Sequence, residues 1–322
     1  EKLPNRLILG SETASTVSSR GQYFFPIEFK DHNVVLHEGN QSNSYDNESC
    51  SWSNTPDLDF ARDDDHDWCI GQFVWTGFDY LGEPSPYDTD AWPSHSSVFG
   101  IIDLASLPKD RYYLYRSKWN DESPTLHILP HWNWKGREDE ITPVFVYTSY
   151  PKAELFINGK SQGMREKNDS TVYNRYRLMW MDTRYEPGEV RVVAYDNDGH
   201  AVAEKTIKTA GKPHHLVAIP DRTSLTANGE DLSYITIQVA DKDGNIIPTD
   251  NRRVKFKVSG AGTFEATANG DPTSLLPFQN PEMDLFSGAA TAIVRSSNSE
   301  GILIFTASAP GVKPVTTTIE VK

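Results

Sequence analysis

Hydrophobic residues in the first 123 positions fall into short continuous runs separated by longer polar or helical stretches. Residues 7–9 and 73–75 are such runs, and they are typical of parallel strands that are covered on both faces. Helical patterns begin at Pro56 and at Pro108, because proline suits the first turn of a helix. The order strand, helix, strand, helix predicts an α/β architecture for residues 1–123. Two strands and two helices do not close a sheet, so this segment is expected to need further βα units.

From residue 124 onward the pattern changes to short strands separated by turn residues, which predicts all-β structure. Asn158-Gly159 follows an apolar run and supplies the positive φ angles that a tight hairpin requires. A junction of small residues at 210–213 precedes a second set of strands, so three domains are predicted, with boundaries at 123/124 and 211/212. The predicted strands are 144–147, 153–157 and 190–195 in the second domain, and 234–240, 254–258, 289–295, 302–307 and 315–321 in the third.

The charge balance argues against two classes of partner. The chain has 31 Lys and Arg against 45 Asp and Glu, a formal net charge of −14. Such a surface repels phosphate backbones and anionic lipids, so neither nucleic acid nor a membrane is expected as a partner. No apolar run reaches about 18 residues, the length needed to cross a bilayer. Residues 1–20 lack a signal-peptide pattern, and the chain opens at Glu1 on a strand-like run, so an upstream portion is expected to be missing.

The two cysteines, Cys50 and Cys69, are too few for a disulfide framework and too far apart for a CxxC motif. In an oxidising compartment these two residues can pair with each other, whereas a reducing compartment keeps them as thiols. A disulfide and two free thiols therefore both remain open.

Polar and aromatic residues at the ends of the two apolar runs are the candidates for chemistry. Glu12 follows the first run, and the carboxyl ends of barrel strands are where catalytic side chains point into a pocket. Trp75 ends the second run, and Asp79 follows it. An indole in this place can stack on the apolar face of a sugar while a nearby carboxylate accepts its hydroxyls. The alternatives are a solvated Glu12, a core Trp75 and a solvated Asp79.

Together these motifs resemble glycoside hydrolase family 2, the family of bacterial β-galactosidases and β-glucuronidases. Residues 7–12, which end in Ser11-Glu12, look like the family's nucleophile strand, the seventh of its barrel. Residues 73–75 look like the eighth strand with its sugar-stacking tryptophan, and residues 99–110 resemble the loop into the last barrel helix. Further motifs are similar to accessory β-sandwich domains found downstream in such enzymes: 129–134, 154–161 and 269–272.

The resemblance implies a fold and a function. Residues 1–123 would be the C-terminal piece of a (β/α)8 TIM barrel, 124–211 a β-sandwich and 212–322 an immunoglobulin-like β-sandwich. The implied activity is that of a retaining exo-β-glycosidase, foremost a β-galactosidase, which hydrolyses the terminal β-linked sugar of an oligosaccharide or a polysaccharide-derived glycan. The family's bacterial members imply a periplasmic or extracellular location. The alternative is a non-catalytic fragment whose sandwiches act as spacers or bind carbohydrate.

The resemblance also assigns roles to residues. Glu12 would be the nucleophile, while Trp75 and Asp79 would bind substrate. The acid/base glutamate of the family lies upstream of the nucleophile, outside this chain, so the isolated chain is expected to be inactive without the missing upstream portion of the barrel. Four local acids are expected to be solvated loop residues instead: Glu38, Glu48, Glu83 and Glu122.

No cofactor is expected. Metal-assisted members of the family carry a sodium-binding Asn just before the glycine that corresponds to Gly100, and here Phe99 occupies that position, so no metal is expected there. The polar insert 22–55 contains aromatic residues that either select substrate at the aglycone side or tie the insert to the barrel wall. His131 is expected to be a hydrogen-bonded structural residue.

Overall fold

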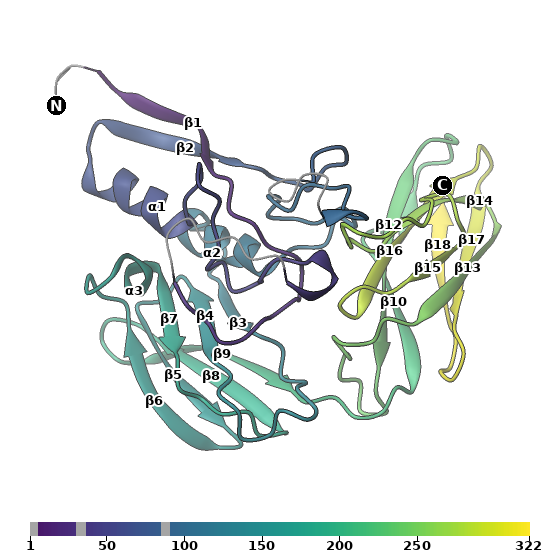
Figure 1. Cartoon of the computed structure of the whole chain (residues 1–322). Coiled ribbons are helices and arrows are strands. Elements are labelled where there is room, and N and C mark those ends of the chain that lie inside the picture. Colours follow the sequence, from purple (N-terminus) through teal and green to yellow (C-terminus); the bar gives the residue numbers. More distant parts are fainter. Residues whose placement is uncertain (1–5, 30–36, 85–90) are drawn as a thin grey trace. The chain divides into compact units, whose positions relative to one another are not determined.

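A computed structural model describes residues 6–29, 37–84 and 91–322. Residues 30–36, which belong to the predicted insert 22–55, lie outside the described residues. The chain forms two compact units, and β-strands are the main secondary structure of both (Figure 1). Unit 1 comprises residues 1–103 and 108–208, and unit 2 comprises 104–107 and 209–322. In the part of the chain that the structure describes, no helix is long and apolar enough to cross a membrane.

The α/β part of unit 1 contains two parallel strands and the helices that follow them. Strand β1 (Ile8–Ala14) pairs with β2 (Cys69–Trp75), in a register that places Thr13 opposite Val74 and Ala14 opposite Trp75. This pairing confirms the parallel strands expected from the two apolar runs. A short 3-10 helix η1 (Glu38–Asn40) and helix α1 (Pro56–Asp65) follow β1, and helix α2 (Asp110–Trp119) follows β2.

Large apolar side chains of these two strands are exposed, although the sequence pattern predicted that both faces of the sheet would be covered. Leu9 of β1 and Ile70 and Phe73 of β2 are 48%, 56% and 64% exposed. One side of the sheet packs near α1, since Gln72 of β2 donates a hydrogen bond to Asp63 of that helix at 2.6 Å. No described residue covers the exposed side chains, so this small sheet is an incompletely buried structure.

The β part of unit 1 is a sandwich of two antiparallel sheets. Residues of β5 alternate between buried and partly buried, as expected for a strand with one face in a core. Trp132, Leu155, Trp180 and Val192 contribute to the core between the sheets. The first sheet has the order β3-β4-β7, with β3 (Leu126–Leu129), β4 (Val144–Thr148) and β7 (Arg177–Trp180). The second has the order β6-β5-β8-β9, with β6 (Lys160–Glu166), β5 (Lys152–Ile157), β8 (Glu189–Tyr195) and β9 (Ala201–Lys208), and helix α3 (Val172–Tyr176) precedes β7.

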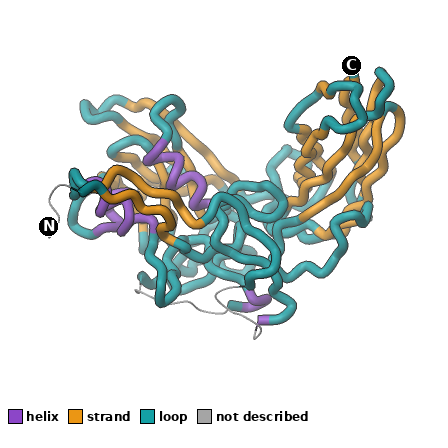
Figure 2. The backbone as a smooth tube through the Cα atoms, turned by 90° about the horizontal axis from the view of Figure 1, so that it is seen from above, coloured by secondary structure: helices purple, strands orange, loops and turns teal. Residues whose placement is uncertain are grey.

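A second core joins the α/β part of unit 1 to this sandwich. Tyr45 of the insert, Phe60 of α1 and Tyr115 of α2 pack with Phe145 and Tyr147 of β4. Long loops supply much of the chain around this core (Figure 2). The predicted boundary at 123/124 therefore lies inside one compact unit, and at least Tyr45 of the insert serves to anchor it.

Unit 2 is a second β-sandwich. Ile235, Ile237 and Val239 alternate along one sheet and pack against Leu303 and Phe305 of the other. The first sheet has the order β10-β12-β16-β14, with β10 (His215–Pro220), β12 (Leu232–Ala240), β16 (Ala289–Ser296) and β14 (Gly262–Ala268). The second has the order β11-β18-β17-β13-β15, with β11 (Ser224–Leu225), β18 (Val315–Val321), β17 (Gly301–Ser308), β13 (Arg253–Gly260) and β15 (Glu282–Asp284). The boundary between the units, at 208/209, lies close to the predicted domain boundary at 211/212.

Candidate functional site

Glu12 lies near the carboxyl end of β1, and its side chain is exposed. The next residue, Thr13, donates a hydrogen bond to Gln72 at 2.7 Å, and Gln72 in turn contacts α1. The pairing with β2 has a register shift between Gly10 and Thr13, so strand alternation does not fix the direction of the Glu12 side chain, but its negative charge acts on Tyr80 beyond the end of β2. Trp75 of β2 lies on the face that is turned away from α1, since Gln72 contacts α1 and Trp75 is three positions further along the strand.

Trp75 takes part in a short chain of hydrogen bonds at the end of β2. Its indole Nε1 donates to the hydroxyl of Tyr80 at 3.1 Å, and that hydroxyl donates to Glu83 Oε2 at 2.6 Å. The two rings meet edge to face, with centroids 6.1 Å apart. The Trp75 side chain is 39% exposed, so one part of the indole is fixed by Tyr80 while another remains accessible to a ligand.

The hydroxyl of Tyr80, which belongs to this hydrogen-bonded group, is also influenced by Glu12. Burial raises the pKa of the Tyr80 hydroxyl to about 12, assisted by the hydrogen bond to Glu83 and by the negative charges of Glu83 and Glu12. The Glu12 carboxylate therefore lies close enough to Tyr80 to act on it electrostatically. Since Tyr80 remains protonated at neutral pH, its hydroxyl is a hydrogen-bond donor in this site. The structure thus brings together Glu12 and Trp75, which were predicted, with Tyr80 and Glu83, which were not.

Asp79 precedes Tyr80 in the sequence and is buried. Its Oδ2 is 2.7 Å from Lys109 Nζ, and its Oδ1 accepts a hydrogen bond from the Gly100 amide at 2.8 Å. Burial raises the pKa of the Asp79 carboxyl to about 6, an effect that the Lys109 charge opposes. Asp79 is therefore not a solvated residue, and both of its oxygens already have partners within the protein. Its predicted contact with a sugar stays a prediction.

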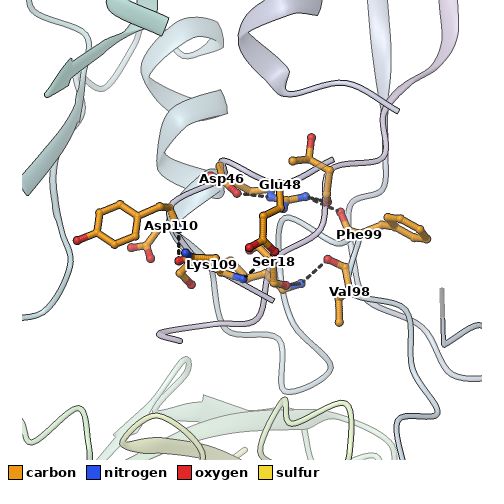
Figure 3. Close-up of polar contacts among 12 residues, drawn as sticks. Ser18, Asp46, Glu48, Val98, Phe99, Lys109 and Asp110 are labelled. Atoms are coloured by element: carbon orange, nitrogen blue, oxygen red, sulfur yellow. Dashed lines mark hydrogen bonds and ion pairs between the residues drawn. The ribbon is translucent and has the colours of Figure 1, made fainter. Parts of the chain in front are cut away.

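Further charged residues are buried between the loop that follows β1 and helix α2 (Figure 3). Arg111 is paired with Asp46 at 2.9 Å and also donates to the carbonyl of Phe99 at 3.2 Å. Glu48 was expected to be solvated, and this expectation was wrong: it is 2% exposed and lies 2.5 Å from His37 Nε2. The error arose because the partner of Glu48 comes from a different part of the insert, which a local pattern does not reveal.

Cys50 and Cys69 do not form a disulfide in the structure. Cys50 is buried, and burial raises the pKa of its thiol to about 11. A thiol that stays protonated at neutral pH is a poor nucleophile, so Cys50 has the properties of a core residue.

Two family models match parts of the chain. Glycoside hydrolase family 2 C-terminal domain 5 matches residues 216–318, and a domain of unknown function, DUF4982, matches residues 139–203. Both matches fall in the two sandwiches, and neither includes the α/β part of unit 1.

Similar proteins include a β-galactosidase of Bacteroides ovatus, 37% identical over 96% of this chain and 36% of that protein. A putative β-glucuronidase of Formosa agariphila is 30% identical over 79% of this chain and 24% of that protein. The chain thus spans about a third or less of the length of these relatives. Among solved structures, a β-glycosidase from Bacteroides vulgatus superposes with a TM-score of 0.84 at 29% identity, over 97% of this chain and 42% of that one. A family 2 glycosyl hydrolase from Bacteroides cellulosilyticus gives a TM-score of 0.77 at 27% identity, over 100% of this chain and 40% of that one.

Proposed function

Because the chain belongs to glycoside hydrolase family 2, as the C-terminal part of such an enzyme, we propose that it supplies the nucleophile of a retaining exo-β-glycosidase. One observation carries the proposal: Glu12 and Trp75 lie near the carboxyl ends of paired parallel strands, and both are close to Tyr80, which accepts a hydrogen bond from Trp75 and is influenced by the charge of Glu12. The first candidate substrate is a terminal β-galactoside, since the Bacteroides ovatus relative is a β-galactosidase. A β-glucuronide is the second candidate, supported by the Formosa agariphila relative.

The exposed apolar side chains of β1 and β2 are an argument that these strands belong to a larger barrel. A two-stranded sheet is marginally stable by itself, and large apolar side chains exposed together mark a surface that another element covers. We propose that the covering element is the upstream portion of a (β/α)8 barrel, in which β1 and β2 are the last two strands. The coverage of the relatives agrees with this, because they extend well beyond the matched region.

In the proposed mechanism the Glu12 carboxylate attacks the anomeric carbon of the terminal sugar. A new bond forms between the Glu12 oxygen and that carbon as the bond to the leaving oxygen breaks, and the upstream acid/base residue protonates the leaving oxygen. Water, deprotonated by the same residue, then displaces Glu12 and restores the original configuration. The exposure of Glu12 supports this role, since a substrate can reach its carboxylate.

Trp75 would form the floor of the sugar site. The hydrogen bond from its indole to Tyr80, and from Tyr80 to Glu83, limits the rotation of the ring and presents a fixed surface for stacking. A ring that is held before the substrate binds loses less conformational entropy on binding. Tyr80 and Glu83 are thus proposed to orient Trp75.

The decisive test uses a protein extended upstream through the proposed barrel, with the 322-residue chain as the comparison. The extended protein should hydrolyse nitrophenyl β-galactoside, whereas the chain alone should be inactive because general acid catalysis and substrate positioning are both absent. Glu12→Gly in the extended protein should reduce turnover on the order of 10³-fold or more. Added azide should then restore turnover and give the α-glycosyl azide, because azide enters from the face that Glu12 has vacated. A β-glycosyl azide would assign Glu12 to the acid/base role and refute the proposal.

A further inference from the structure

The ammonium group of Lys109 is enclosed by three oxygen atoms. Lys109 is 1% exposed, and its Nζ donates to the carbonyls of Ser18 at 2.7 Å and Val98 at 3.2 Å (Figure 3). The third oxygen is Asp79 Oδ2, at 2.7 Å. An ammonium has three N–H donors, so each has one acceptor. We refer to these three oxygens as the Lys109 cage.

The chemistry of the cage is that of a site for a simple cation. Two neutral backbone carbonyls and one carboxylate are hard oxygen ligands of the kind that hold metal cations in proteins, and carbonyl oxygens replace the hydration shell of K⁺ in ion channels. The cage also balances the charge, because one carboxylate faces one monovalent cation. Removal of the ammonium would leave Asp79 buried and uncompensated, which is costly.

The cage connects the loops that leave the two parallel strands. Ser18 belongs to the loop after β1, whereas Asp79 and Val98 belong to the loop after β2. The amide of Ser18 also donates to the Val98 carbonyl at 3.0 Å, so the two loops meet directly at the cage. One cation therefore fixes three chain segments that are distant in sequence.

The backbone of Lys109 is itself fixed. Its amide donates to Ile101 O at 3.0 Å, and its carbonyl accepts from the amide of Tyr112 at 3.1 Å, in the first turn of α2. The ammonium is thus delivered from a rigid base, with little conformational entropy left to lose except that of the side chain.

We infer that Lys109 is a tethered monovalent cation: it occupies a site that binds a free small cation once the side chain is removed, and it sets the relative position of the two loops. This inference goes beyond the proposed glycosidase function and holds whether or not the chain contributes to catalysis. Its tests are therefore made on the 322-residue chain, without an activity assay.

All eight tryptophans lie in unit 1, so tryptophan fluorescence follows the thermal unfolding of that unit. The test compares the wild-type chain with two variants. Lys109→Ala removes the ammonium and most of the side chain, whereas Lys109→Met keeps a side chain of similar length but carries no charge. Each is unfolded in tetramethylammonium chloride, whose cation is too large for the cage, and in ammonium or potassium chloride at the same concentration.

Both variants should lose about 6–15 °C of Tm in tetramethylammonium chloride, because Asp79 is left without its partner. Ammonium or K⁺ should restore about 3–5 °C to Lys109→Ala, while the wild type and Lys109→Met should change by less than about 1 °C. Equal responses of Lys109→Ala to all three salts, or a Lys109→Met variant as stable as the wild type, would overturn the inference.

A double variant keeps the inference testable should Lys109→Ala fail to fold. Lys109→Met combined with Asp79→Asn leaves no charge in the cage, so it should regain at least about half of the Tm lost by Lys109→Met alone and should not respond to ammonium or K⁺. A double variant that is as unstable as Lys109→Met would show that charge compensation is not what Lys109 provides, and would also overturn the inference.

Discussion

Replacing Arg177 with Met should destabilise unit 1 by about 3–5 kcal/mol, because this change leaves a buried carboxylate without its partner. The side chains of Arg177 on β7 and Asp57 on α1 are both fully buried, and Arg177 Nε lies 2.8 Å from Asp57 Oδ1. The guanidinium also donates to the carbonyls of Tyr45 at 2.9 Å and Asp46 at 3.2 Å. One side chain of the sandwich therefore holds the insert and α1 at once.

The expected loss of stability follows from the partners that lose the Arg177 guanidinium. Loss of the ion pair accounts for most of the cost, and each carbonyl that loses its donor adds on the order of 1 kcal/mol. Asp57→Asn should cost a similar amount, and the double variant should cost at least about 2 kcal/mol less than the sum of the two single changes, because the residues interact directly. Arg191→Met is a matched control, since its pair with Glu204 is partly exposed and should be worth less than about 1 kcal/mol.

Urea unfolding monitored by tryptophan fluorescence measures these effects in unit 1. A single transition that moves to lower urea in both single variants would show that the α/β part and the first sandwich unfold together. Arg177→Met with a stability within about 1 kcal/mol of the wild type would refute the reasoning, as would a second transition that the substitution leaves unchanged.

Three further predictions follow from buried or exposed side chains described above. Burial lowers the pKa of the His131 imidazole to about 4, so the unfolded chain binds a proton that the folded chain does not between about pH 6.5 and pH 4. In urea unfolding, the wild type should lose about 3 kcal/mol more than His131→Phe between pH 7 and pH 4, because the variant lacks this group. Gly100→Ala should lower the stability by at least about 2 kcal/mol in urea unfolding, because its Cβ would lie 2.2 Å from the Asp79 amide nitrogen. Trp75→Ala should reduce kcat/KM of the extended protein by about 5- to 150-fold, the equivalent of about 1–3 kcal/mol of lost stacking and burial.

Each of these predictions has a control and a contrary outcome. The same loss between pH 7 and pH 4 in His131→Phe would assign the effect to other groups. Gly77→Ala places its Cβ in open space in the same loop and should be nearly neutral, so equal effects at Gly77 and Gly100 would contradict the steric argument. Trp68→Ala, at the opposite end of β2 and 37% exposed, should leave kcat/KM within about twofold. If Trp75→Ala behaves in the same way, Trp75 does not contact the sugar.

The sequence predicted most of the fold because local chemistry determines much of it. Asn158 and Gly159 have φ values of 48° and 77°, and the hairpin between β5 and β6 forms there as expected. The five strands predicted in unit 2 are present, with ends that differ by at most two residues. Strand β14 was missed because its residues, Gly262–Ala268, are mostly small or polar, and its pairing with β16 rather than its own pattern makes it a strand.

The candidate site could be predicted only where a residue's position at the end of a strand marked it as a candidate. Glu12 and Trp75 could be named because each follows or ends an apolar run. The partner of Asp79 could not be predicted, because Lys109 is thirty positions away in sequence and contacts Asp79 only in the folded chain. Tyr80 carried a usable signal, since it is the next aromatic after Trp75 that can donate a hydrogen bond.

The central claim, that Glu12 is the nucleophile, is tested most directly by trapping the covalent intermediate. A 2-fluoro β-galactosyl inactivator forms a long-lived ester with the nucleophile of a retaining enzyme, and peptide mass mapping of the extended protein identifies the labelled carboxylate. We predict a single label on the peptide that contains Glu12, and no label in Glu12→Gln. A label on any other carboxylate, such as Glu83, would contradict the assignment.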